Sequence, residues 1–180
     1  MKDNRKIKIG VLGAANIALS SVIPELESLN NNFKFVGIES RNPEWVNFDG
    51  RGFEGYESIL DNKVLDAVYI PLPNSLHYEW VKKSIQKGLH VMVEKSLACE
   101  VEEVFELNES ARKSNLVLLE NFQFRFHSQL SRILKILEGG EIGDLRIIRS
   151  TFCFPPFPDK TNIRYNSALG GGALFDAGAY

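Results

Sequence analysis

The stretch IKIGVLGAANIA, residues 7–18, decides the fold. A short apolar run ends at Leu12 and leads directly into small residues. Gly13, Ala15 and Ala18 stand where a dinucleotide-binding turn needs a tight bend, a close approach to a pyrophosphate and close packing of helix on strand. The full glycine pattern is missing, so this turn alone leaves ligand binding open.

Such a turn would present its first backbone groups to phosphates. The amides that open the following helix point towards an anion at its N-terminus. The residues concerned are Gly13, Ala14, Ala15, Asn16 and Ile17.

Short apolar runs alternate with segments of helical period along most of the chain, which is typical of strand-helix-strand units around a parallel sheet. The predicted strands are Ile7–Leu12, Phe33–Ile38, Ala67–Ile70, His90–Val93 and Leu116–Leu119. The predicted helices are Asn16–Leu29, Tyr56–Asp61, Tyr78–Lys87 and Glu100–Ser114, the second being short. The pattern predicts an α/β fold with a doubly wound, parallel, Rossmann-like sheet.

The character of the sequence changes after Leu119. Gln129–Leu137 is predicted to be a helix, and Leu145–Phe154 a long strand that opens the antiparallel sheet of a second, α+β domain. We expect two apolar stripes to face inward: Val101, Val104, Phe105 and Asn108 in one helix, and Leu130, Ile133, Leu134 and Leu137 in the other.

Composition narrows the class of protein. The 180 residues are 44% hydrophobic with a formal net charge of −2, and the basic residues are scattered, which disfavours nucleic acid and anionic membranes as partners. Cys99 and Cys153 fit neither a disulfide framework nor a metal site, so we expect a cytoplasmic protein. The three histidines, His77, His90 and His127, do not cluster at metal-ligand spacing. A small-molecule partner is the better expectation.

The end of the second strand bears on which dinucleotide would bind. If Ser40 and Arg41 occupy the tip, serine can donate to a 2′-phosphate and the guanidinium can pair with it, which favours NADP. Glu39 would then point away. A shift of one residue would bring Glu39 to the ribose and favour NAD.

Two further stretches are specific: YIPLPNSLHYEW at residues 69–80 and GLHVMVEKS at 88–96. Together with the opening turn and the terminal GGGALFDAGAY, they resemble the Gfo/Idh/MocA family of NAD(P)-dependent oxidoreductases in order and spacing. With a tyrosine at position 180, the chain resembles the branch of this family that contains glucose-fructose oxidoreductase, dimeric dihydrodiol dehydrogenases and nucleotide-sugar 3-ketoreductases.

The resemblance implies roles for particular residues. Those lining the cofactor cleft would be Pro71, Leu72, Pro73, Asn74 and His77, with Glu94 and Lys95 standing for the family's Glu-Lys-Pro motif. Here Ser96 replaces the proline, which removes a fixed φ and a preference for a cis bond. Lys95, Asp176 and Tyr180 would form the catalytic set.

The implied reaction is hydride transfer between NADP, or NAD, and a carbinol or ketone carbon of a sugar-like substrate. Tyr180 would donate the proton and Lys95 would stabilise the developing alkoxide. Two alternatives stay open: a non-catalytic NADP-binding module that acts as a sensor or partner-binding protein, and an NAD-dependent glycosidase-like enzyme.

The resemblance also implies a division into a dinucleotide-binding domain, residues 1–122, and the beginning of a substrate and dimerisation domain, residues 123–180. Family members continue past Tyr180 with the rest of the antiparallel sheet. We therefore expect a truncated chain of low activity, whose complete protein forms a homo-oligomer.

Overall fold

The computed structural model describes residues 5–40, 55–178 and 180. Its strands are β1 (Ile7–Leu12), β2 (Phe33–Glu39), β3 (Ala67–Ile70), β4 (His90–Val93) and β5 (Leu118–Glu120). Its helices are η1 (Ala18–Val22), α1 (Ile23–Ser28), α2 (Tyr56–Leu60), α3 (Asn74–Gln86), α4 (Val101–Lys113), η3 (Gln123–Phe126), α5 (Ser128–Glu138), η4 (Ile163–Tyr165), η5 (Ser167–Leu169) and α6 (Ala173–Ala177).

The five strands form one sheet in the order β2-β1-β3-β4-β5, and every neighbouring pair is parallel. The chain passes from β2 across β1 to β3 and then moves outward, so the order reverses beside β1. In an open parallel sheet, ligands bind at the carboxyl ends of the strands next to such a reversal. The predicted doubly wound, Rossmann-like sheet is confirmed.

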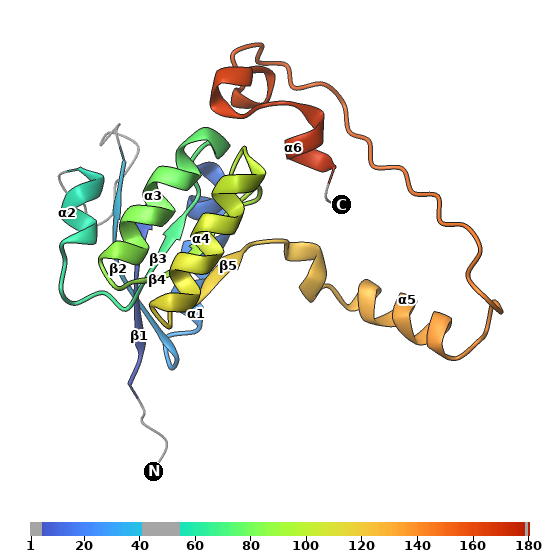
Figure 1. Cartoon of the computed structure of the whole chain (residues 1–180), viewed down its shortest axis with the longest axis horizontal. Helices are drawn as coiled ribbons and strands as arrows, with labels where there is room; N and C mark the ends of the chain where they lie inside the picture. The colour runs from blue at the N-terminus through green and yellow to red at the C-terminus, as the bar shows by residue number, and fades with distance from the viewer. Residues whose placement is uncertain (1–4, 41–54, 179) are drawn as a thin grey trace.

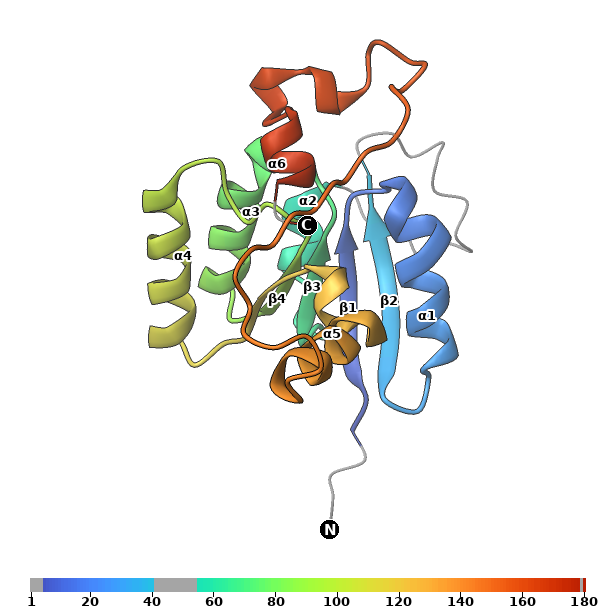
Figure 2. The ribbon, with the colours of Figure 1, turned by 90° about the vertical axis from the view of Figure 1, so that its right-hand side faces the viewer.

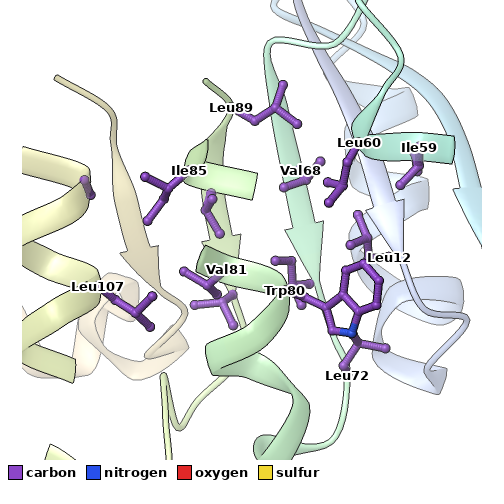
Figure 3. Packing of buried hydrophobic residues seen from close by; sticks show 14 of the residues in the cluster. Leu12, Ile59, Leu60, Val68, Leu72, Trp80, Val81, Ile85, Leu89 and Leu107 are labelled. Atoms are coloured by element: carbon purple, nitrogen blue, oxygen red, sulfur yellow. The ribbon is translucent and has the colours of Figure 1, made fainter. Parts of the chain in front are cut away.

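Helices cover the sheet on two sides (Figures 1 and 2). On one face, α2, α3 and α4 pack on the larger apolar core, where Trp80 and Val81 of α3 lie in one cluster with strand residues such as Leu12 and Val68 (Figure 3). On the other face, η1 and α1 pack on a smaller core that includes Tyr69. Burial of these side chains supplies most of the stabilisation of the fold.

The helix after β1 begins with a wide turn. Residues from Asn16 to Ser28 are helical throughout, but in η1 the Ile23 N–H donates to the Ala18 carbonyl five residues back. The next residue, Pro24, has no N–H and would crowd a regular α-helix, so a π turn just before it accommodates the ring.

Several expectations about the sides of helices were wrong. In α4 the buried residues are Leu107 and Ala111, whereas Val101 and Phe105 are exposed. Val104 of the expected stripe is half-buried and does pack against the core, so the buried side of α4 is rotated by only part of a turn from the expected one. In α5 no residue is buried, although its apolar residues follow a helical period.

The predicted strand Leu145–Phe154 is also not formed. Residues 145–154 have no regular secondary structure and are exposed, because no described strand lies beside them to accept their backbone hydrogen bonds. The antiparallel sheet is thus absent from the described residues. Figure 1 shows α5 standing away from the sheet and the following segment returning in a long arc to α6.

No described helix is both long enough and apolar enough to cross a lipid bilayer.

Candidate functional site

The turn after β1 is closed tightly against its neighbours. Gly13 has φ +117°, and its N–H donates to the Glu39 carbonyl at 2.8 Å. A Cβ placed on Gly13 would lie 2.8 Å from Leu72 Cδ2. A side chain at this position would therefore meet both backbone strain and a clash. Ala14 and Ala15 follow, half-buried, before the helix begins at the exposed Asn16.

The end of β2 lies next to this turn. Glu39 pairs with Leu12 in the parallel ladder and is buried, and Ser40 follows half-buried. Glu39 therefore does not project into solvent at the strand tip. Arg41, the other residue expected to read the 2′-position, lies outside the described residues.

Lys95 and Asp176 meet at the carboxyl edge of the sheet. The Lys95 ammonium donates to the Asp176 backbone carbonyl and, at 3.0 Å, to its Oδ1. Both side chains are more than four-fifths buried. Burial raises the pKa of the Asp176 carboxyl, but hydrogen bonds from Lys95 and Arg164 outweigh it, so the net shift of that pKa is downward. The peptide between Lys95 and Ser96 is cis.

Tyr180 lies over the same ammonium. Lys95 Nζ is 5.4 Å from the centroid of the Tyr180 ring, and Phe152 stacks on that ring at 5.2 Å with an interplanar angle of 9°. Phe124 packs against it at 5.5 Å. Burial, and then the charges of Glu94 and Asp176, raise the pKa of the Tyr180 phenol. The phenol is therefore protonated at neutral pH and can donate a proton.

Glu94 is held by two donors, one in β3 and one directly after β5. The Tyr69 hydroxyl and the Asn121 amide each donate to Glu94 Oε1 at 2.7 Å. Tyr69 is fully buried in β3, and burial, followed by the charge of Glu94, raises its pKa strongly. Tyr69 therefore stays a donor, and the Glu94 side chain is fixed by Tyr69 and Asn121.

His77, expected to line the cleft, is fully buried instead. Its Nδ1 lies 2.6 Å from the Ser96 carbonyl and its Nε2 lies 2.7 Å from the Leu72 carbonyl. The ring thus connects the turn after β3 with the turn after β4. Any influence of His77 on a ligand in the cleft is exerted through these two turns.

The glycine-rich segment before α6 is anchored on α3. The Asn74 amide donates to the Gly170 carbonyl at 2.8 Å, and a Cβ on Gly170 would lie 2.7 Å from Asn74 Cβ. Asn74, another residue expected to line the cleft, thus links the C-terminal segment to the start of α3. Pro71, also expected to line the cleft, is buried.

Lys95, Asp176 and Tyr180, expected from the sequence to lie together, are in contact through Lys95. Five residues that contact this set or Glu94 were not expected from the sequence: Tyr69, Asn121, Phe124, Phe152 and Arg164. One signal was available for the first of these. A tyrosine in the otherwise aliphatic strand AVYI carries a polar group that needs a partner when buried.

Two family models match the chain. The model described as oxidoreductase family, NAD-binding Rossmann fold, matches residues 7–122, and the GFO/IDH/MocA C-terminal domain model matches residues 130–180.

Curated relatives align along nearly the whole chain. The dTDP-3,4-didehydro-2,6-dideoxy-alpha-D-glucose 3-reductase of Saccharopolyspora spinosa is 38% identical over 98% of this chain and 54% of its own length. The D-xylose 1-dehydrogenase (NADP(+)) 2 of Haloferax volcanii is 32% identical over 95% of this chain and 54% of its own length. The chain thus spans about half the length of the curated relatives it matches.

Among solved structures, a 3-ketoreductase from Actinomadura kijaniata in complex with NADP and TDP-benzene superposes with a TM-score of 0.91. It is 37% identical, and the match covers 98% of this chain and 55% of that one. Both the sequence models and the fold therefore agree, and the chain belongs to the Gfo/Idh/MocA family of oxidoreductases.

Proposed function

We propose that the protein is an NADP-dependent oxidoreductase that transfers a hydride between the nicotinamide and a carbinol or ketone carbon of a sugar or sugar-like substrate. The observation that carries this proposal is the convergence of Lys95, Asp176 and Tyr180 at the carboxyl edge of the sheet. Beside a hydride source, reduction of a ketone needs a proton donor and a group that stabilises the developing alkoxide, and Tyr180 and Lys95 can supply these.

The residues at the first turn fit a dinucleotide. The surroundings of Gly13 leave no room for a side chain at that position. The small residues Ala14 and Ala15 allow a phosphate to approach the backbone closely, and the helix begins at Asn16 and Ile17. This combination is the cradle that a pyrophosphate needs at a helix N-terminus. The bound nicotinamide would supply or accept the hydride.

The choice of NADP over NAD rests on the tip of β2 and on the relatives. Glu39 is buried, so a carboxylate is not presented at the ribose, and Ser40 follows it as a hydrogen-bonding group. The Actinomadura ketoreductase was solved with NADP, and the Haloferax relative is named for NADP(+). We assign Arg41 to the 2′-phosphate on the charge argument from the sequence.

Each catalytic side chain has a distinct task. In the reducing direction Tyr180 gives its proton to the developing alkoxide, which its raised pKa permits at neutral pH. The Lys95 ammonium stabilises the negative charge that forms on the substrate oxygen and, beside the ring, on the phenolate. Asp176 holds that ammonium in place, and Tyr69 and Asn121 fix Glu94, whose charge acts on the Tyr180 phenol.

A sugar nucleotide is the substrate class we favour. The Saccharopolyspora relative is named as a reductase of a dTDP-linked keto sugar, and the Actinomadura structure holds TDP-benzene. We further propose that residues 1–122 bind the dinucleotide and that residues 123–180 belong to the substrate-binding part, a division parallel to the two family models.

Titration of the chain with NADPH and with NADH, followed by nicotinamide fluorescence, tests the cofactor assignment. We expect tighter binding of NADPH, and loss of that preference in R41A. Equal affinities would contradict the assignment of the 2′-phosphate to this strand tip.

A second experiment tests the chemistry. NADPH oxidation is followed with a dTDP-linked 3-keto sugar, comparing the unmodified protein with Y180F and with F126L as a control, because Phe126 is exposed and contacts none of the three catalytic residues among the described contacts. We expect Y180F to lose turnover while it still binds NADPH. Unchanged turnover in Y180F would refute the proposed proton donor.

A further inference from the structure

Arg164 is a second cation on the Asp176 carboxylate. Its Nε donates to Asp176 Oδ1 at 3.0 Å, and Lys95 Nζ donates to that same oxygen at 3.0 Å. Within the described part of the chain, no hydrogen bond from a protein group reaches the other oxygen of Asp176. One oxygen therefore serves both cations.

Arg164 contacts the first turn of α6 at two points. Its backbone carbonyl accepts a hydrogen bond from the Gly172 N–H at 2.9 Å, while its side chain reaches Asp176. The Asp176 N–H in turn donates to the Gly172 carbonyl at 3.0 Å. Arg164 thus fixes both the residue before the helix and the carboxylate four positions later.

The arginine itself is held in one orientation. The Arg164 guanidinium lies over the Phe157 ring, 4.8 Å from its centroid, and the backbone N–H of Arg164 donates to Asn162 Oδ1 at 3.0 Å. A planar guanidinium that stacks on an aromatic ring loses little further freedom when it forms a hydrogen bond. The stacked guanidinium is therefore already oriented for its hydrogen bond to Asp176.

We infer that Arg164 is a positioning residue of the active site, which acts through Asp176 to hold the Lys95 ammonium beside Tyr180. This role rests on the proposed function, since Lys95 and Tyr180 are the groups that would meet the substrate. A guanidinium cation binds an ionised carboxylate far better than a neutral carboxyl group. Without it, Asp176 would be held in its ionised form by Lys95 alone.

The consequence is a specific dependence on pH. Burial favours the protonated form of Asp176, and the Lys95 and Arg164 hydrogen bonds oppose it. Removal of Arg164 takes away one of the two opposing groups, so the pKa of Asp176 must rise. Asp176 then protonates at a higher pH, and Lys95 loses its anionic partner there.

The decisive measurement is the titration of Asp176 in the full chain by NMR, with aspartate labelled at the side-chain carbon and the signal assigned by its loss in D176N. The variants are R164M, R164K and, as a matched control, R146M, whose arginine is exposed and paired with Asp144. We expect the pKa of Asp176 to be higher in R164M than in the unmodified chain, partly restored in R164K and unchanged in R146M. An unchanged pKa in R164M would overturn the inference.

The pH dependence of kcat distinguishes a positioning role from a merely structural one, because loss of a merely structural arginine would not shift the acid limb of the profile. In R164M the acid limb of the kcat profile should move to higher pH, and kcat at a fixed pH on that limb should fall about tenfold for every pH unit by which the limb moves. The Kd for NADPH should stay within about twofold, because the residues of the first turn are untouched. An acid limb that stays in place would overturn the positioning role. If the unmodified protein reduces no keto sugar, the proposed function fails, and the Asp176 titration still decides the contact made by Arg164.

Discussion

Lys95 and Asp176 are 81 residues apart in the chain, yet Lys95 Nζ lies 3.0 Å from Asp176 Oδ1 and donates to the Asp176 backbone carbonyl as well. Their side chains are 15% and 18% exposed, so solvent screens this pair far less than it screens Arg146 and Asp144. The pair therefore links the carboxyl edge of the parallel sheet to α6.

D176N should make the chain less stable near neutral pH, by about 1–2 kcal/mol, because Lys95 and Arg164 lose an anionic partner. The folded-state pKa of Asp176 is lowered, so its contribution is full above the unfolded value of about 3.9 and is lost as pH falls through the folded value. Urea unfolding at about pH 7 and about pH 3 measures this. A gap between the two proteins that is equally large at both pH values would contradict it.

K95M should lower kcat by about 10²–10³-fold, the usual loss when a group that stabilises a developing oxyanion is removed. The affinity for NADPH should change much less, since Gly13 and the following helix remain intact. Steady-state kinetics and nicotinamide fluorescence separate the two effects. K135M, which changes an exposed lysine on α5, is the matched control and should behave like the unmodified protein.

The sheet could be predicted from sequence because its signals are local. The strands β1, β3 and β4 were predicted with the same bounds that the structure has. A run of four to six mostly apolar residues between turn signals is too short for a typical helix, so it favours a buried strand. The strand Leu145–Phe154 failed for the opposite reason. The composition of this segment is a local signal, but a strand also needs neighbouring strands to pair its backbone groups, and no described segment supplies them.

The site could be predicted only where a motif pointed to it. Lys95, Asp176 and Tyr180 were named from the family resemblance, and the structure brings the other two into contact with Lys95; their catalytic role stays a prediction. Arg164 and Asn121 could not be found in this way, because each acts through a side-chain contact between segments that no periodicity relates. The buried place of His77 likewise depends on how two turns pack, not on its own neighbours in sequence.

Y69F should cost about 1–2 kcal/mol of stability and weaken NADPH binding. The variant removes only the hydroxyl that donates to Glu94 Oε1, and leaves the Asn121 amide as the single donor to a half-buried carboxylate. Urea unfolding and NADPH titration measure the two effects. Y78F is the control, because the Tyr78 hydroxyl contacts Glu106 at the surface, and there we expect less than about 0.5 kcal/mol.

H77Q should remove part of the acid sensitivity of the fold. Burial lowers the pKa of His77 and outweighs the two carbonyl contacts, which favour the charged ring. The folded-state pKa then lies below the unfolded value of about 6.5, so the contribution of His77 to stability is full above that value and is lost as pH falls through the folded pKa.

The stability of the unmodified chain should therefore decline below about pH 6.5 more steeply than that of H77Q, as measured by urea unfolding at a series of pH values. H127Q, which changes an exposed histidine, controls for general histidine titration. Parallel curves for the unmodified chain and H77Q would show that His77 is not the group responsible.

G171A should abolish most turnover with little loss of global stability. A Cβ on Gly171 would lie 2.5 Å from the Ile163 carbonyl oxygen, 2.7 Å from that of Asn166 and 2.8 Å from that of Arg164. Backbone atoms cannot yield as a flexible side chain would, so the segment that carries Arg164 must move away from the start of α6. That movement would separate Arg164 from Asp176.

The sheet and its two cores lie elsewhere, so the unfolding midpoint of G171A in urea should stay close to that of the unmodified chain, while kcat falls at least about tenfold because positioning is lost. G140N serves as the control: Gly140 has φ +69°, which asparagine tolerates, and a Cβ there meets open space. Normal turnover in G171A would mean that this segment can shift without disturbing Lys95, Asp176 and Tyr180, and the role assigned to Arg164 would fall with it.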